Sequence, residues 1–178
     1  MMSRRGAFNI ILCGLLLGLG MGCESTGDKK KKDDMLTALD LHLETNPDGT
    51  ERTKTVSILR ASPVQITVEV TDFLDEGSVR EAAVVETGGG FVIQILFDAH
   101  GRLVLENVTS ANRGRRMGIF TRFPQPRWLG APKINSIIRD GILTFTPDCS
   151  REEADRIVKG LNNVAKKVQK DSFFKEDK

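Results

Sequence analysis

Apolar and polar residues alternate along several short stretches of the chain, which is the pattern of strands with one buried face. Leu39, Leu41 and Leu43 alternate with polar or charged neighbours, and the ranges 53–59 and 64–70 have the same character. A glycine-rich loop at 87–90 separates two further apolar runs, as in a hairpin. The pattern therefore predicts strands at 39–43, 53–59, 64–70, 83–86, 91–97, 116–123 and 142–146.

Two segments have helical periodicity instead. Asp98 is placed to cap a helix that carries Val104, Val108 and Ala111 on one face and ends at Gly114. The second segment begins after Ser150, which forms a capping box with Glu153. It predicts a long amphipathic helix with the apolar residues Ala154, Ile157, Val158, Leu161, Val164, Ala165 and Val168.

These elements predict an α+β fold in two layers. Neighbouring strands joined by short turns pair antiparallel, and both helices need an apolar surface to cover. We expect one antiparallel sheet with two helices on one face, in the order β-β-α-β-β-α. The proline-containing segment 124–132 is expected to be a loop. Asp140-Gly141 is expected to form a tight turn between 134–138 and the strand at 142–146.

The amino terminus is organised as a bacterial export signal. Arg4 and Arg5 precede an uncharged apolar run from Phe8 to Leu19, too short for the ~20 residues of a transmembrane helix. The small residues before Cys23 resemble the lipobox of bacterial lipoproteins, although Gly20 stands where an aliphatic residue is usual. The resemblance implies cleavage before Cys23, acylation of Cys23 and attachment to a membrane. An ordinary cleaved signal that happens to contain Cys23 is the alternative.

The rest of the chain divides into a tether, one domain and a tail. We expect 1–22 to be the signal peptide, 23–35 a flexible tether, 36–170 a single domain and 171–178 a C-terminal tail. Removal of 1–22 leaves 24 basic and 24 acidic residues, so the charge gives no reason to expect nucleic acid. Cys149 is then the one cysteine besides Cys23, so no internal disulfide is expected.

Several short motifs follow one another in a fixed order between about Val64 and Val168. They are Phe73-Leu74-Asp75-Glu76, Phe97-Asp98-Ala99-His100-Gly101, Thr109, Gly114-Arg115-Arg116-Met117-Gly118-Ile119-Phe120, Ala131-Pro132-Lys133-Ile134, Ile138 with Gly141, and Ser150 with Glu152, Glu153 and Ala154. In this order and spacing they resemble the head subdomain of the first periplasmic region of SecD-type (SecD/SecDF) protein-export accessory proteins. The resemblance implies their α+β fold and a setting in the cell envelope. It does not imply proton-driven work, because we find no counterpart of that family's intramembrane acidic residues, and fold alone does not fix function.

A run without acidic residues extends from Asn107 to Arg139 and contains seven basic residues with Phe120, Phe123 and Trp128 among them. Such a local excess of positive charge suits binding to anionic lipid headgroups or to an acidic partner. A tryptophan in a segment stiffened by prolines is typical of a residue that anchors an interface. The candidate partner-binding residues are therefore Arg115, Arg116, Arg122, Arg127 and Trp128. The alternative is that the basic residues pair internally with the acidic residues Asp72, Asp75, Glu76, Glu81 and Glu86.

Residues suited to catalysis or metal binding are few. Cys149 precedes a helix start, which lowers a thiol pKa, but no motif links it to His42 or His100. Asp40, His42 and Glu44 share a strand face and are metal-ligand types, although the polar face of a strand explains them equally well. We expect no enzymatic activity, no catalytic residue, no metal site and no cofactor.

The sequence thus predicts a non-enzymatic binding or docking module of the cell envelope, anchored to a membrane through lipidated Cys23 and facing the periplasm. Its expected partner is an exported polypeptide or an envelope protein. A purely structural envelope lipoprotein is the alternative, and a small-ligand or thiol-dependent protein is a further one. Glu24 after the cysteine favours the outer membrane, and the choice between inner and outer membrane stays open.

Overall fold

The computed structural model describes residues 35–123 and 125–176, so the predicted signal peptide, Cys23 and nearly all of the tether lie outside the described residues. The described chain is α+β, as predicted. Its helical segments are the 3-10 turn η1 (Glu76–Ser78), α2 (Ala99–Ala111) and α3 (Arg151–Glu176). Its strands are β1 (Leu39–Leu43), β2 (Thr53–Ile58), β3 (Val64–Glu69), β4 (Leu74–Asp75), β5 (Val79–Thr87), β6 (Gly90–Phe97), β7 (Met117–Thr121), β8 (Arg127–Gly130) and β9 (Ile142–Phe145).

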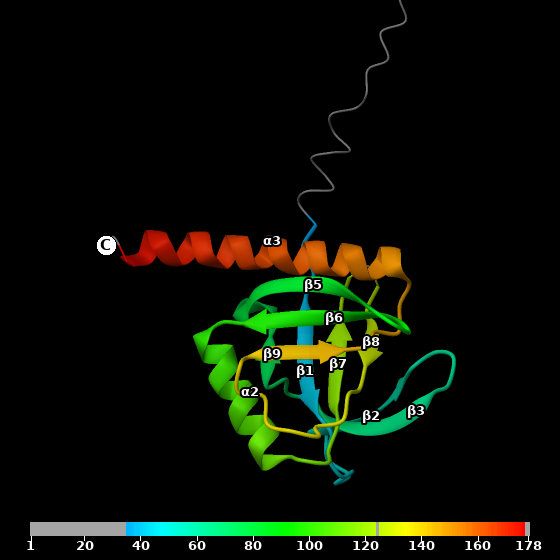
Figure 1. The fold of residues 1–178 in the computed structure, drawn as a ribbon. Helices are drawn as coiled ribbons and strands as arrows, with labels where there is room; N and C mark the ends of the chain where they lie inside the picture. Colours follow the sequence, from blue (N-terminus) through cyan, green and yellow to red (C-terminus); the bar gives the residue numbers. More distant parts are fainter. Residues whose placement is uncertain (1–34, 124, 177–178) are drawn as a thin grey trace, which may run out of the picture.

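The described strands form three antiparallel sheets, where the order of elements led us to expect one. The sheets have the strand orders β4-β1-β7-β8, β5-β6-β9 and β2-β3. In Figure 1, β5, β6 and β9 run across β1 and β7, and the β2-β3 hairpin curves away from them. The antiparallel pairing is confirmed, but three strands rather than two separate α2 from α3.

The main hydrophobic core draws on the two larger sheets and both long helices. Its fully buried side chains include Leu41 of β1, Ile119 of β7, Ile93 and Ile95 of β6, Leu105 of α2, and Ile157 and Leu161 of α3. A smaller core lies under the β2-β3 hairpin, formed by Val56, Ile58, Ile66 and Val68 with Trp128 and Ala131 packed against it. The hairpin is thereby joined to the face of β1 and β7 that points away from the main core.

Local sequence signals located both helix starts correctly. Asp98 Oδ1 accepts a hydrogen bond from Gly101 N at 2.7 Å, and Ser150 Oγ accepts one from Glu153 N at 3.2 Å. The buried face of α2 is one residue away from the predicted one, because Leu105 and Thr109 are buried while Val104 and Val108 are half-buried. Thr109 can be buried because its hydroxyl donates to Leu105 O and accepts from Ile138 N.

The prediction of a loop at 124–132 is wrong for Arg127–Gly130, which form β8. β8 pairs with β7 and is the last strand of its sheet. An edge strand tolerates flanking prolines such as Pro126 and Pro132, because its outer N–H groups need no partner in the sheet. Pro124 lies outside the described residues.

The tight turn at Asp140-Gly141 does not join two paired strands. The backbone of residues 134–138 forms hydrogen bonds with other segments and not with β9. Ile134 N donates to Arg115 O at 2.8 Å, and Ile138 N donates to Thr109 Oγ1 at 3.0 Å. β9 pairs instead with β6, and this places Leu143 and Phe145 in the main core. The pairing of β9 is therefore set by core packing and not by the preceding turn.

Helix α3 lies along β5 and continues past the end of the sheet (Figure 1). Its predicted apolar face is confirmed at Ala154, Ile157, Leu161 and Ala165, which are buried. The helix runs to Glu176, through most of the predicted tail at 171–178. None of the helices among the described residues has the length and apolarity needed to cross a membrane.

The incoming chain crosses α3 beside Gly160 and Asn163. Asn163 Nδ2 donates to Met35 O at 3.0 Å, and Thr37 is fully buried against Gly160. A Cβ at position 160 would lie only 2.9 Å from Thr37 Cβ and 3.0 Å from Thr37 N. Glycine at 160 therefore permits the crossing.

We expect Gly160→Ala to lower the free energy of unfolding by about 1–3 kcal/mol, because the added methyl overpacks the contact with Thr37. Alanine normally stabilises a helix by about 1 kcal/mol relative to glycine. A loss of stability in Gly160→Ala would therefore come from the contact with Thr37 and not from helix propensity. Urea denaturation measures the change, with the exposed Lys166→Ala as a control expected within about 0.5 kcal/mol of the parent protein. A Gly160→Ala protein as stable as the parent would contradict the crossing.

Candidate functional site

An open groove of about 630 Å³ lies beside β9. Three segments form its walls: the loop that follows β2, the end of β8 with the residues after it, and β9 with the residues after it. We call it the β9 groove; its lining is Leu59, Ala61, Ser62, Val92, Gly130, Ala131, Pro132, Thr144, Phe145, Thr146, Pro147 and Asp148. Apolar and small residues dominate this lining, so the groove suits the side chains of another polypeptide better than a highly charged small molecule.

The outer edge of β9 presents unpaired backbone groups along this groove. β9 ends its sheet, and Phe97 N donates to Gly141 O at 3.0 Å just before the strand begins. Backbone groups alternate between the two edges of a strand, so the residues that pair with β6 are Gly141, Leu143 and Phe145. The N–H and C=O groups of Thr144 therefore point away from β6, whereas Thr146 follows the end of the strand and its carbonyl oxygen lies close to Gly130 of β8. Among the described residues no strand pairs with that edge.

Leu59 forms part of the groove wall in an unusual backbone conformation. Its φ is +69°, in the left-handed region that leucine rarely adopts, and its side chain is 38% exposed. Such a conformation costs about 1–3 kcal/mol and persists only where neighbouring contacts hold it. Leu59 thus gives the groove wall a partly exposed apolar side chain.

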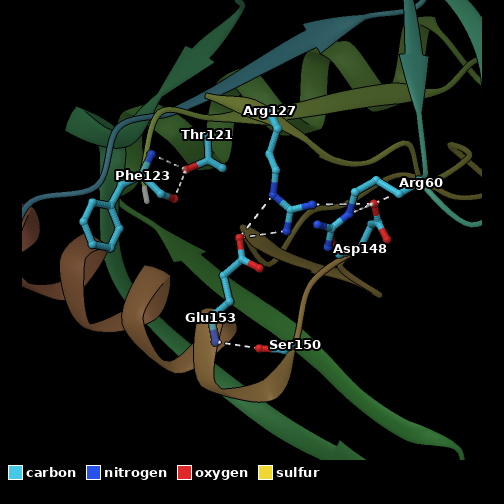
Figure 2. A network of polar contacts seen from close by, with 7 residues as sticks. All are labelled: Arg60, Thr121, Phe123, Arg127, Asp148, Ser150 and Glu153. Carbon is cyan, nitrogen blue, oxygen red and sulfur yellow. Dashed lines mark hydrogen bonds and ion pairs between the residues drawn. The ribbon is translucent and has the colours of Figure 1, made fainter. Parts of the chain in front are cut away.

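A polar network fixes this wall to the body of the domain (Figure 2). Arg60 donates from its backbone N and its Nε to Asp148 Oδ2, at 3.0 and 3.3 Å, and from Nη2 to Asp148 O at 3.3 Å. Asp148 N in turn donates to Leu129 O of β8 at 2.7 Å. The loop after β2, β8 and the segment after β9 are thereby held together around the groove.

Arg127 lies at the centre of this network. Its Nε and Nη2 both donate to Glu153 Oε1, at 3.1 and 2.8 Å, and its Nη1 lies 3.6 Å from Asp148 Oδ2 (Figure 2). All three side chains are less than 20% exposed. Charge-assisted hydrogen bonds of this kind are the stronger ones in proteins, so Arg127 connects β8 firmly to the first turn of α3.

A second, smaller hollow of about 230 Å³ lies between the outer face of β1 and β7 and the β2-β3 hairpin. We call it the Trp128 hollow. Trp128 packs on His42 and Phe120, with ring centroids 5.3 and 5.1 Å apart. Glycine at 118 leaves room for the indole, since a Cβ there would lie 2.8 Å from Trp128 Cζ3. His42 Nδ1 lies 2.9 Å from Glu69 O, which ties β1 to the hairpin.

Asp40 sits at this hollow as a nearly buried carboxylate. Burial raises the pKa of Asp40 above its ordinary value of 3.8, and the guanidinium of Arg122 opposes the rise. Arg122 Nη2 lies 2.7 Å from Asp40 Oδ2, and its guanidinium carbon lies 6.0 Å from the centre of the Phe120 ring. The pair is partly open to water because the Arg122 side chain is 57% exposed.

The structure separates the five predicted partner-binding residues. Arg122 and Trp128 line the Trp128 hollow, whereas Arg127 is half-buried in the network described above. Arg115 and Arg116 lie at the opposite end of β7 from Arg122, a strand-length of about 20 Å away at ~3.3 Å per residue. The five residues therefore do not form a single basic patch.

Internal pairing does occur, but with acidic residues other than the predicted ones. Arg122 pairs with Asp40, Arg127 with Asp148 and Glu153, and Arg139 with Glu106. Arg113 and Arg116 donate to the backbone carbonyls of Asn135 and Ala131. Of the predicted acidic partners, Glu86 pairs with Arg151 of α3, outside the basic run.

The residues considered for catalysis or metal binding are engaged in other ways. Burial raises the pKa of the Cys149 thiol to about 11, with the nearby Glu153 adding to the rise, so Cys149 is protonated at neutral pH. Asp40 faces Arg122, while Glu44 Oε2 accepts from Arg116 N at 2.7 Å. Within the described residues there is no group of three or more His, Cys, Asp or Glu side chains placed to hold a metal ion.

Sequence reasoning missed the β9 groove. Its walls come from segments far apart in the chain, and the edge of β9 is identified only once its pairing with β6 is known. The break at Ala61-Ser62-Pro63 was a visible signal, since a turn directly after an apolar strand marks an exposed loop tip.

Comparisons with known proteins show a shared fold. No protein-family model and no curated protein sequence matches the chain. A solved structure of SecDF, described as a membrane component that enhances protein export, matches 86% of this chain and 72% of its own, with 19% identity and a TM-score of 0.55. The crystal structure of SecDF in its super-membrane-facing form matches 78% of this chain but 21% of its own, with the same identity and TM-score. The predicted resemblance to SecD-type proteins is confirmed for the fold.

We expect Arg127→Ala to destabilise the protein by about 2–3 kcal/mol, because it leaves the largely buried carboxylate of Glu153 without its cation, while Asp148 keeps Arg60. Arg139→Ala is the matched control: its partner is also a glutamate, but Arg139 is 70% exposed, and its loss should cost less than about 1 kcal/mol. Urea denaturation compares the two variants. Equal losses of stability in the two variants would mean that the contacts of Arg127 do not hold β8 to α3.

The raised pKa of Asp40 predicts a pH-dependent effect of Asp40→Asn. The folded protein binds this proton more tightly than the unfolded chain, so the native carboxyl lowers stability as the pH rises from about 4 through its raised pKa. Asp40→Asn should therefore be at least as stable as the parent protein at pH 7, with the difference vanishing near pH 3. Denaturation at several pH values tests this, and a variant whose deficit grows with pH would contradict it.

Proposed function

We propose that this protein is a lipoprotein of the cell envelope, anchored through acylated Cys23, whose domain faces the periplasm and binds extended segments of exported polypeptides in the β9 groove. It acts as a docking module and not as an enzyme. Anchoring is supported by the sequence before Cys23, where a basic start, a short apolar core and small residues occur in the order of a lipoprotein signal.

The observation that carries the binding proposal is the unpaired edge of β9 beside an apolar groove. An extended peptide can add to such an edge as a further strand, with main-chain hydrogen bonds to Thr144. Its alternate side chains would contact the lining of the groove. Because the main chain provides the hydrogen bonds, this mode accepts many sequences, which suits a protein that meets different exported chains before they fold.

Two further observations agree with this function. The walls of the groove are fixed by the Arg60–Asp148 and Arg127–Glu153 contacts, so the site is formed before a ligand arrives. The fold is that of SecDF, which is described as enhancing protein export. A domain of this fold on a lipid anchor would meet exported chains in the same compartment.

A fixed envelope protein is the second candidate partner. Arg122 and Trp128 at the Trp128 hollow offer an exposed cation beside aromatic rings, and such residues are frequent interface anchors. Arg115, at the other end of β7, would contact the partner at a separate point. A purely structural envelope lipoprotein would use this surface and leave the β9 groove empty.

The substitution Thr144→Pro tests the binding mode. It removes an N–H that points away from β6, so the pairing of β6 with β9 stays intact, and edge strands tolerate proline. Thr144→Val is the control, because it changes the same side chain and keeps the N–H. We expect Thr144→Pro to weaken polypeptide binding about fivefold, the value of one main-chain hydrogen bond, and Thr144→Val to bind normally.

The measurement is photo-crosslinking in cells from a reactive amino acid at Ser62, on the groove wall, with Leu103 on the exposed side of α2 as the control position. Adducts from Ser62 to several unfolded exported chains, reduced by Thr144→Pro but not by Thr144→Val, support the proposal. Adducts to one envelope protein, in a yield that neither substitution changes, would instead support the structural alternative. Circular dichroism checks that both variants fold.

A further inference from the structure

The outer face of α3 carries a concentrated positive charge. No acidic residue occurs between Arg156 and Lys170, and this stretch contains five exposed basic residues: Arg156, Lys159, Lys166, Lys167 and Lys170. At 3.6 residues per turn they fall within an arc of about 100°, centred opposite the buried Leu161. We call this surface the α3 basic face.

Among the described residues, few acidic side chains lie beside this charge. Glu81 of β5 lies beside Lys166 at a shallow hollow that Arg80 also lines, so these two neighbours offset each other. Asp155 and Asp171 lie just beyond the two ends of the stretch. In a mature chain predicted to be neutral overall, the α3 basic face is therefore a local excess of positive charge on one helix.

The chain enters the domain on this same face. Asn163, which donates to Met35 O, lies within the arc of the basic residues, and Gly160 beside it accommodates Thr37. Met35 thus leaves the domain from the side of α3 that faces away from the core, as the blue start of the described chain shows in Figure 1. Whatever precedes Met35 begins at the α3 basic face.

The distance to the proposed anchor is short. Cys23 precedes Met35 by twelve residues, and a chain of that length spans at most about 40 Å. With Cys23 acylated, a tether of this length lets the α3 basic face reach the membrane surface. Attraction between lysines and anionic headgroups acts within a Debye length of about 8 Å, which this attachment allows α3 to reach.

We propose that the α3 basic face rests on an anionic phospholipid surface. This inference rests on the anchoring at Cys23 proposed above and adds an orientation to it. α3 packs on β5, while β9 forms the other edge of the same sheet, two strand spacings or about 10 Å further away. Contact through α3 therefore turns the β9 groove away from the headgroups and leaves it open to exported chains.

The test uses the full-length protein isolated from its membrane and reconstituted in vesicles of pure phosphatidylcholine or of phosphatidylcholine with one third phosphatidylglycerol. Acetylation of lysines is followed by mass spectrometry. We expect Lys166, Lys167 and Lys170 to react several-fold more slowly on the anionic vesicles, with the protection lost in 1 M salt. The exposed Lys54 and Lys133 serve as internal references and should react equally on both.

A variant pair gives a second readout. The combined change Lys166→Glu, Lys167→Glu and Lys170→Glu should abolish protection at Lys159 on anionic vesicles, whereas Lys54→Glu with Lys133→Glu should leave it unchanged. Equal reactivity of the α3 lysines on both vesicle types would overturn the inference. The intact mass reports acylation of Cys23 independently, so a missing anchor is distinguished from a missing α3 contact.

Discussion

The burial of one guanidinium between two carboxylates holds the candidate site together. Arg127 joins β8 to Glu153 in the first turn of α3 and to Asp148 after β9, and Asp148 also holds Arg60 at the end of the β2-β3 hairpin. Four segments distant in sequence are thereby fixed around one groove. Movement of the hairpin would break the contacts of Arg60 with the side chain and backbone carbonyl of Asp148.

This arrangement explains how an open strand edge can be kept in a folded protein. Unpaired edges invite uncontrolled association, and natural proteins keep them short or shield them. β9 has four residues, and the loop at 59–62 and the segment 130–132 form walls of the groove beside it. An extended chain can enter the groove, whereas a second folded copy would meet these walls. The proposed binding of unfolded polypeptides agrees with these walls.

Elements with local signals could be predicted from the sequence, and contacts between distant segments could not. The alternation at Leu39–Leu43, the glycine hairpin at 87–90 and the caps Asp98 and Ser150 each act within a few residues, and the structure contains all of them. The strand β8 was not predicted because prolines flank it. The pairing of β9 with β6 was not predicted because packing in the core determines it. Arg127 reads as a surface cation until Glu153 is known to be its neighbour.

Amide hydrogen exchange of the full-length protein tests the central claim most directly. It is measured with and without an excess of a reduced, carboxymethylated periplasmic protein that cannot fold. Strand addition predicts that the amide of Thr144 becomes strongly protected, while Leu143 and Phe145, already paired with β6, change little. Binding of the unfolded protein with unchanged exchange at Thr144 would contradict the account.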